Sequence, residues 1–157
     1  MKEAKKRERK LATLVSVLSS IPNIWSASSV KTEPEKWLDN WQVYKTIKAN
    51  IQPELFGYHF VGHDVRGGHG AVSSKIDRFD PIKMCGVTLS GRVYQLIGMP
   101  GVNQDAQYTL SGWIQRNEVV MEDATEEFVL HYKIDLERVC KMDIRDEMVL
   151  SLRRKQT

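Results

Sequence analysis

The sequence predicts an α+β protein, with N-terminal helices packed on a small, mainly antiparallel sheet of short strands and one helix after a central hairpin. Three patterns predict it: apolar residues at helical spacing before residue 50, alternating apolar segments between residues 58 and 97, and a capped helical pattern after residue 101. A chain of 157 residues, 41% hydrophobic and 27% charged, has the size and composition of one globular domain. We therefore expect a single domain over residues 32–152, between two basic ends.

The first basic end covers residues 1–31, with a basic arm, an amphipathic helix and a connector. The apolar residues recur at i, i+3, i+4 and i+7, as in a helix with one apolar face: Leu11, Leu14, Val15 and Leu18. A basic start, an apolar stretch and the small residues 26–29 also resemble a secretory signal, but hydroxyl side chains dilute the apolar stretch. We expect a cytoplasmic protein, with the periplasm or secretion as the alternative if residues 1–28 are a signal peptide.

Charge is distributed unevenly along the chain. Residues 1–10 have a net charge of +4, the tail 153–157 adds +3, and residues 11–150 contain 14 basic and 18 acidic residues. The domain itself is therefore mildly acidic, which argues against a broad cationic face. The arms could still contact nucleic acid through their basic side chains, and these are Lys5, Lys6, Arg7, Arg9, Lys10, Arg153 and Arg154.

A second helix is expected from Thr32, which can cap it, to Asn50. Its apolar residues follow the helical period, and these are Trp37, Leu38, Trp41, Tyr44 and Ile47. The helix should end by Asn50, because Pro53 disfavours helical geometry at Gln52.

Four short strands should follow, at Tyr58–Val61, Ala71–Ile76, Lys83–Leu89 and Arg92–Ile97. The last two read as a hairpin with the two-residue loop Ser90-Gly91. That register places Val87 opposite Tyr94 and Cys85 opposite Leu96, and it gives Gly91 a positive φ.

The C-terminal third is predicted from caps and alternation. A helix should follow Pro100-Gly101 with Asn103 or Asp105 as its cap. Alternating apolar residues predict a strand over residues 128–134, and Asp135 can cap a short helix after it. Met148, Leu150 and Leu152 alternate again, which favours a closing edge strand.

The stretch from Gly62 to Gly70 has the most unusual composition. It places the acid–base and anion-binding side chains His63, Arg66 and His69 among glycines, and Arg92 joins them if the strands are neighbours. The spacing matches neither a P-loop nor GxGxxG, and no GxSxG or paired CxxC is present. The alternative is a solvated hairpin loop. We expect no metal and no cofactor.

Trp25, in the connector, is the tryptophan that best suits a partner contact, because exposed aromatics anchor interfaces. The other three fall on helical apolar patterns and suit a core.

The stretch Thr88–Gly101 (TLSGRVYQLIGMPG), with Tyr108 and Trp113 after it and Arg66-Gly-Gly-His-Gly before it, resembles the core of a family of small uncharacterised bacterial proteins. That family is associated with prophages and other mobile elements. The resemblance covers about residues 60–117 and implies no known activity.

The expected function is that of a non-enzymatic accessory protein, encoded by a phage or mobile element, that contacts a host protein, host complex or defence factor. Two alternatives remain. One is a nucleic-acid-binding regulator that uses the basic arms, and the other is a small enzyme centred on His63, Arg66 and His69.

Overall fold

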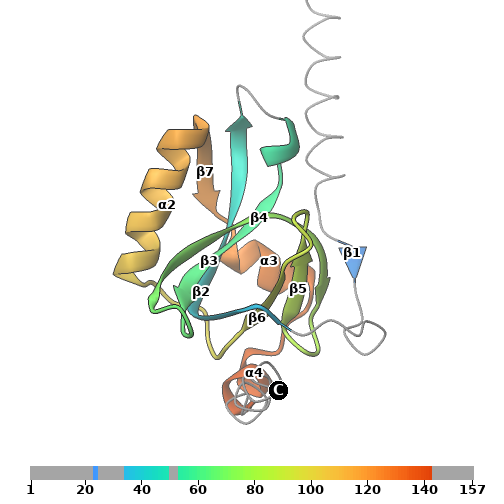
Figure 1. Cartoon of the computed structure of the whole chain (residues 1–157). Helices are drawn as coiled ribbons and strands as arrows, with labels where there is room; N and C mark the ends of the chain where they lie inside the picture. Colours follow the sequence, from blue (N-terminus) through green and yellow to red (C-terminus); the bar gives the residue numbers. More distant parts are fainter. Residues whose placement is uncertain (1–22, 25–33, 50–52, 143–157) are drawn as a thin grey trace, which may run out of the picture.

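A computed structural model describes residues 23–24, 34–49 and 53–142 (Figure 1). The basic arm, the helix expected at residues 11–18, Trp25, and the strand and tail expected after residue 147 lie outside these residues. No helix within the described residues is long and apolar enough to cross a membrane.

Sheet dominates the described residues, and their α-helices come after the first six strands (Figure 1). The strands are β1 (Asn23–Ile24), β2 (Lys36–Ala49), β3 (Tyr58–Asp64), β4 (His69–Asp80), β5 (Cys85–Thr88), β6 (Val93–Leu96) and β7 (Val119–Asp123). A 3-10 turn, η2 (Pro53–Leu55), precedes β3. The helices are α2 (Gln104–Asn117), α3 (Thr125–His131) and α4 (Leu136–Lys141). The predicted layout, with N-terminal helices packed on a small sheet, is therefore wrong.

Strands β2 to β6 close into a barrel. Each pairs antiparallel with the next, and β6 then pairs in parallel with β2. The parallel closure follows from the odd number of strands, because four successive reversals leave the first and fifth strands pointing the same way. Two strands extend this ring: β1 pairs with β4, and β7 pairs with the second half of β2.

The segment predicted as the second helix is strand β2. Its pairing with β3 skips from Asp39 to Gln42 while β3 advances from His63 to Val61, so β2 carries a bulge there. Asn40 in the bulge has a φ of 44°. Because the bulge adds one residue, Leu38 and Trp41 both reach the barrel interior at a spacing of three, which imitates a helical period.

The hairpin between β5 and β6 lies where the sequence predicts it, but its register differs by one residue. Val87 pairs with Val93 and Cys85 with Gln95. The loop has three residues, because the Thr88 amide donates to the Arg92 carbonyl and the Gly91 amide to the Thr88 carbonyl. Gly91 has a φ of 83°, which confirms its expected conformation and matches the three-residue hairpin that ends in a left-handed residue.

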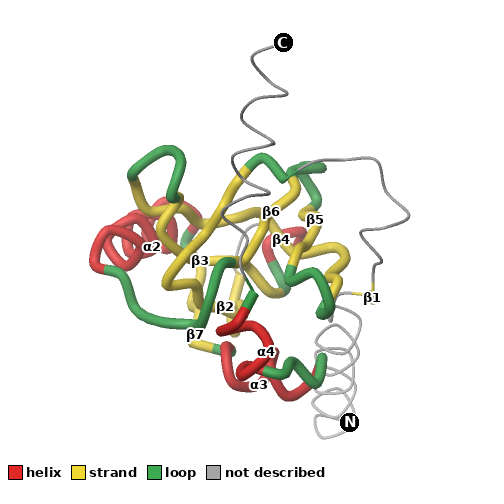
Figure 2. The backbone as a smooth tube through the Cα atoms, turned by 90° about the horizontal axis from the view of Figure 1, so that it is seen from below, coloured by secondary structure: helices red, strands yellow, loops and turns green. Residues whose placement is uncertain are grey.

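Helix α2 confirms the prediction after Pro100-Gly101. The Asn103 Oδ1 accepts a hydrogen bond from the Ala106 amide at 2.9 Å and caps the helix. α2 packs on the outside of the barrel, where Ala106 and Leu110 meet Val61 of β3 (Figure 2).

The segment predicted as a strand at residues 128–134 is mostly helix α3. Ala124, Phe128 and Tyr132 are buried at a spacing of four, whereas Leu130, which the alternating pattern placed in the core, is 70% exposed. Lys133 has a φ of 52°, and the Ile134 amide donates to the Val129 carbonyl. This bond closes the helix as a Schellman motif.

The short helix predicted after Asp135 is confirmed as α4, since the Asp135 side chain accepts from the amides of Glu137 and Arg138. Figure 2 shows α3 and α4 together on one side of the barrel. Residues from these helices join the barrel interior in the main core, which is aromatic in its centre: Phe60, Phe79, Tyr94, Phe128 and Tyr132. The helices therefore complete the core of the barrel.

Candidate functional site

The glycine-rich stretch forms the hairpin between β3 and β4, organised around Asp64. The Asp64 carboxylate is buried, lies 3.1 Å from Lys36 Nζ and accepts from the Arg66 amide at 3.2 Å. Burial acts to raise the pKa of Asp64, but the Lys36 ammonium and the amides of Gly67 and Arg66 together lower it below its usual value. Asp64 is thus an anion already engaged in holding the turn.

The local geometry of this hairpin requires glycine at three positions. A Cβ on Gly67 would lie 2.6 Å from the Asp64 carboxylate, and Gly68 has a φ of 70°. A Cβ on Gly70 would overlap the backbone of α2 at Asp105. The glycine pattern is therefore accounted for by the turn and by the close approach of α2.

The side chains predicted to form a site here do not converge. His63 and Asp64 are consecutive on β3, so they point to opposite faces of the sheet. His63 lies 3.1 Å from the Asp39 carboxylate, whereas His69 Nε2 is 3.9 Å from Asp64. Within the described residues, Arg66 Nη1 is buried without a hydrogen-bond partner.

Arg92 lies near the same end of the barrel as Asp64. Its Nε is 3.7 Å from the Glu35 carboxylate. Burial raises the pKa of the neighbouring Tyr94, the negative charges of Asp64 and Glu35 add to that effect, and Arg92 opposes it. The tyrosine is therefore a neutral phenol at physiological pH.

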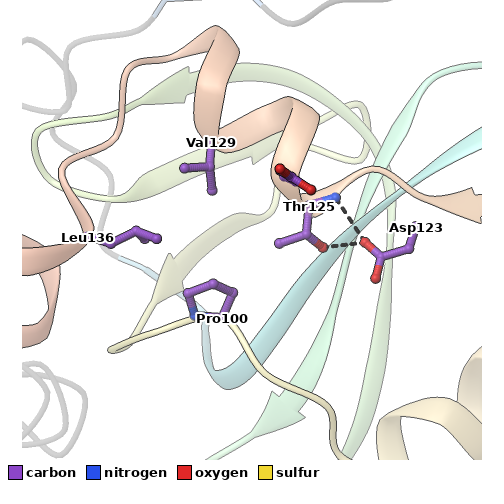
Figure 3. Close-up of a pocket in the computed structure, with 6 residues that line it drawn as sticks. Pro100, Asp123, Thr125, Val129 and Leu136 are labelled. Carbon is purple, nitrogen blue, oxygen red and sulfur yellow. Dashed lines mark hydrogen bonds between the residues drawn. The ribbon is translucent and has the colours of Figure 1, made fainter.

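A second candidate is a cavity of about 370 Å³ at the part of the barrel that α3 and α4 cover (Figure 3). Its lining comes from the loop after β6, the corner between β7 and α3, and the start of α4: Pro100, Asp123, Thr125, Glu126, Val129 and Leu136. Pro100, Val129 and Leu136 form apolar walls, and Asp123 and Glu126 supply carboxylates. This composition suits a contact with an apolar side chain beside a cationic one.

A hydrogen-bond network fixes the corner of this cavity. Asp123 Oδ1 accepts from the Thr125 amide at 2.9 Å and from its hydroxyl at 2.6 Å, as the dashed lines in Figure 3 show. Asp123 Oδ2 accepts from Gln42 at 2.8 Å, and Gln42 in turn accepts from Gln107 of α2. The Val43 amide donates to the Thr125 hydroxyl at 3.0 Å. The cavity wall is thus rigidly joined to β2 and α2.

The chain around this corner is strongly acidic. Residues 118–127 contain five acidic residues and no basic one. Lys45 of β2 offsets two of them, since its Nζ lies 3.1 Å from Glu122 and 3.0 Å from Glu127. Leu130 on α3 is 70% exposed next to Val129. We call the six cavity-lining residues together with Glu122 and Leu130 the β7–α3 surface.

Sequence reasoning missed this surface. The alternating apolar pattern placed Leu130 inside a strand over residues 128–134, and no site was predicted among the acidic residues after position 117. The cavity is assembled from three separate segments between residues 100 and 136, so the sequence offered only the acidic residues 118–127 as a signal. Trp25 and the arm residues named above lie outside the described residues.

Comparison with known proteins adds no identity: no family model, curated protein or solved structure matches this chain. Among the described residues, no three His, Cys, Asp or Glu side chains gather as metal ligands would.

Proposed function

We propose that the protein is a non-enzymatic accessory protein that binds a partner protein through the β7–α3 surface. The observation that carries this proposal is a cavity with apolar walls beside residues 118–127, five of which are acidic. Interfaces are anchored where an apolar side chain fills a pocket surrounded by polar groups. A partner segment with an apolar residue beside Lys or Arg matches both parts.

The resemblance to mobile-element proteins supports a host protein, host complex or defence factor as the partner, and the cytoplasm as the place of contact. Intact-mass measurement of the intracellular protein tests the compartment, since cleavage near residues 26–29 would point to secretion instead. The enzyme alternative is weaker, because the histidines of the glycine-rich hairpin lie on two faces of the sheet.

Affinity capture from the native host tests the proposal, with nuclease-treated lysate as background. The bait is the full chain, and the interface variant is Glu126→Lys with Leu130→Ser, both exposed positions on α3. The matched control is Glu54→Lys with Leu89→Ser, which makes the same exchanges at exposed positions of η2 and the β5–β6 hairpin.

We expect the wild type and the control variant to retain the same partner, and the interface variant to lose it. Retention by all three proteins, at matched folded fractions, would contradict the proposed surface.

A further inference from the structure

Strand β7 has one unpaired edge among the described residues. It pairs antiparallel with β2, from Tyr44↔Asp123 to Ala49↔Val119, and with no other described strand. No backbone hydrogen bond within the described residues reaches its other edge. An open strand edge is a template for a further strand, and proteins usually cover or charge it.

The edge is both apolar and acidic. Val120 is 50% exposed, and the strand is preceded by Glu118 and ends in Glu122 and Asp123. A second copy of β7 would bring these carboxylates together, so charge disfavours pairing between two copies. A strand followed by basic residues would be attracted.

The chain carries such a segment beyond the described residues. Met148, Leu150 and Leu152 alternate with other residues, as in a strand, and Arg153, Arg154 and Lys155 follow directly. The N-terminal arm is also basic, but residues 1–10 lack apolar alternation. The C-terminal segment therefore matches the edge in both pattern and charge.

The segment can also reach the edge. The first residue of α4, Leu136, lines the same cavity as Asp123, the last residue of β7. The six residues of α4 extend about 9 Å, and the chain from residue 142 to residue 148 spans up to about 20 Å. Entry from the Asp123 end makes the segment antiparallel to β7. Its basic residues then arrive at Glu118, where the C-terminus of α2 also favours cations.

We propose that residues 148–152 add to the free edge of β7 as an antiparallel strand, with residues 153–155 against Glu118. This contact places the tail beside the β7–α3 surface, where it competes with an incoming partner. The competition rests on the proposed function, whereas the contact itself does not.

Amide hydrogen exchange of the full chain tests the contact. In the wild type, the β7 amides that do not bond to β2 should exchange at least about tenfold more slowly than open amides. Leu150→Pro removes a donor from the added strand and should abolish that protection. The control Gln156→Pro lies beyond the segment and should leave it intact.

Two charge-reversal variants distinguish the C-terminal segment from the N-terminal arm. Arg153→Glu with Arg154→Glu should weaken the protection of β7, while Lys5→Glu with Lys6→Glu should not. Unprotected β7 amides in the wild type, protection that survives Leu150→Pro, or protection that rises with protein concentration and so reports a second copy would each overturn the proposal. Partner capture by the interface and control variants is read separately, so loss of this contact does not decide the proposed function.

Discussion

Gly70 lies under the first turns of α2, where a Cβ would come within 2.6 Å of the Thr109 hydroxyl and would overlap the Asp105 backbone. His69, one residue earlier, has a side chain that is 59% exposed. At the scale of single residues, the hairpin is therefore governed by its glycines and by the buried Asp64. The exposed His69 side chain contributes little to packing.

Gly70→Ala should destabilise the fold by about 1–3 kcal/mol, because a rigid helix backbone must move to admit the methyl group. His69→Ala should change the free energy of unfolding by less than about 0.5 kcal/mol, as at other surface positions. Chemical denaturation of both variants measures the difference. Equal stabilities would contradict the close approach of α2 to the hairpin.

At the scale of elements, the sequence predicts well where local signals decide and fails where the tertiary structure does. The cap of α2 by Asn103, the cap of α4 by Asp135 and the left-handed Gly91 are confirmed, because each depends on residues close in sequence. Strand β2 was mistaken for a helix because its bulge gives buried residues a spacing of three. Helix α3 was mistaken for a strand because Leu130, although exposed, completes an alternating pattern of apolar residues over 128–134.

The buried His59 links β3 to β4, η2 and α2, and its protonation makes the stability of the fold depend on pH. His59 of β3 lies with Nδ1 3.0 Å from the Ser73 carbonyl of β4 and Nε2 2.9 Å from the Leu55 carbonyl of η2. Its ring also contacts Trp113 of α2. Burial lowers the pKa of His59, and hydrogen bonds to the two carbonyls oppose this without overcoming it. The folded protein therefore holds His59 neutral.

Because the unfolded chain takes up this proton at a higher pH than the folded one, stability should be full above about pH 6.5 and fall below it. The window from pH 7 to 5 avoids the titration of ordinary carboxylates. Denaturation midpoints across that window should decline in the wild type and stay flatter in His59→Gln. A wild-type midpoint that rises as the pH falls would show that the two carbonyls hold a charged imidazolium instead.

At the scale of the whole molecule, the acidic domain and the basic ends are separate parts of the chain. The candidate surface joins residues from position 100 to position 136 with a network that reaches back to Gln42. No local pattern could predict that assembly, because it depends on the closure of the barrel and on the register of β7 against β2. The sequence shows the acidic residues of 118–127, but it does not show that the fold brings Pro100, Val129 and Leu136 together beside them.

For nucleic acid, we expect weak binding without sequence preference, carried by the arm residues 2–10 and 153–155. Neutralising a few phosphates gives an affinity that falls steeply with salt. Titration of labelled DNA at low ionic strength and at about 200 mM salt measures this, with deletion of residues 2–10 as the comparison. Tight, salt-resistant binding would favour the regulator alternative.

The most direct test of the β7–α3 surface is hydrogen exchange of the full chain with and without its captured partner. We expect the partner to slow exchange over residues 97–102 and 124–136, which surround the cavity, and to leave residues 62–70 unchanged. Protection confined to the glycine-rich hairpin and the neighbourhood of Arg92, with residues 124–136 unaffected, would contradict the proposed surface.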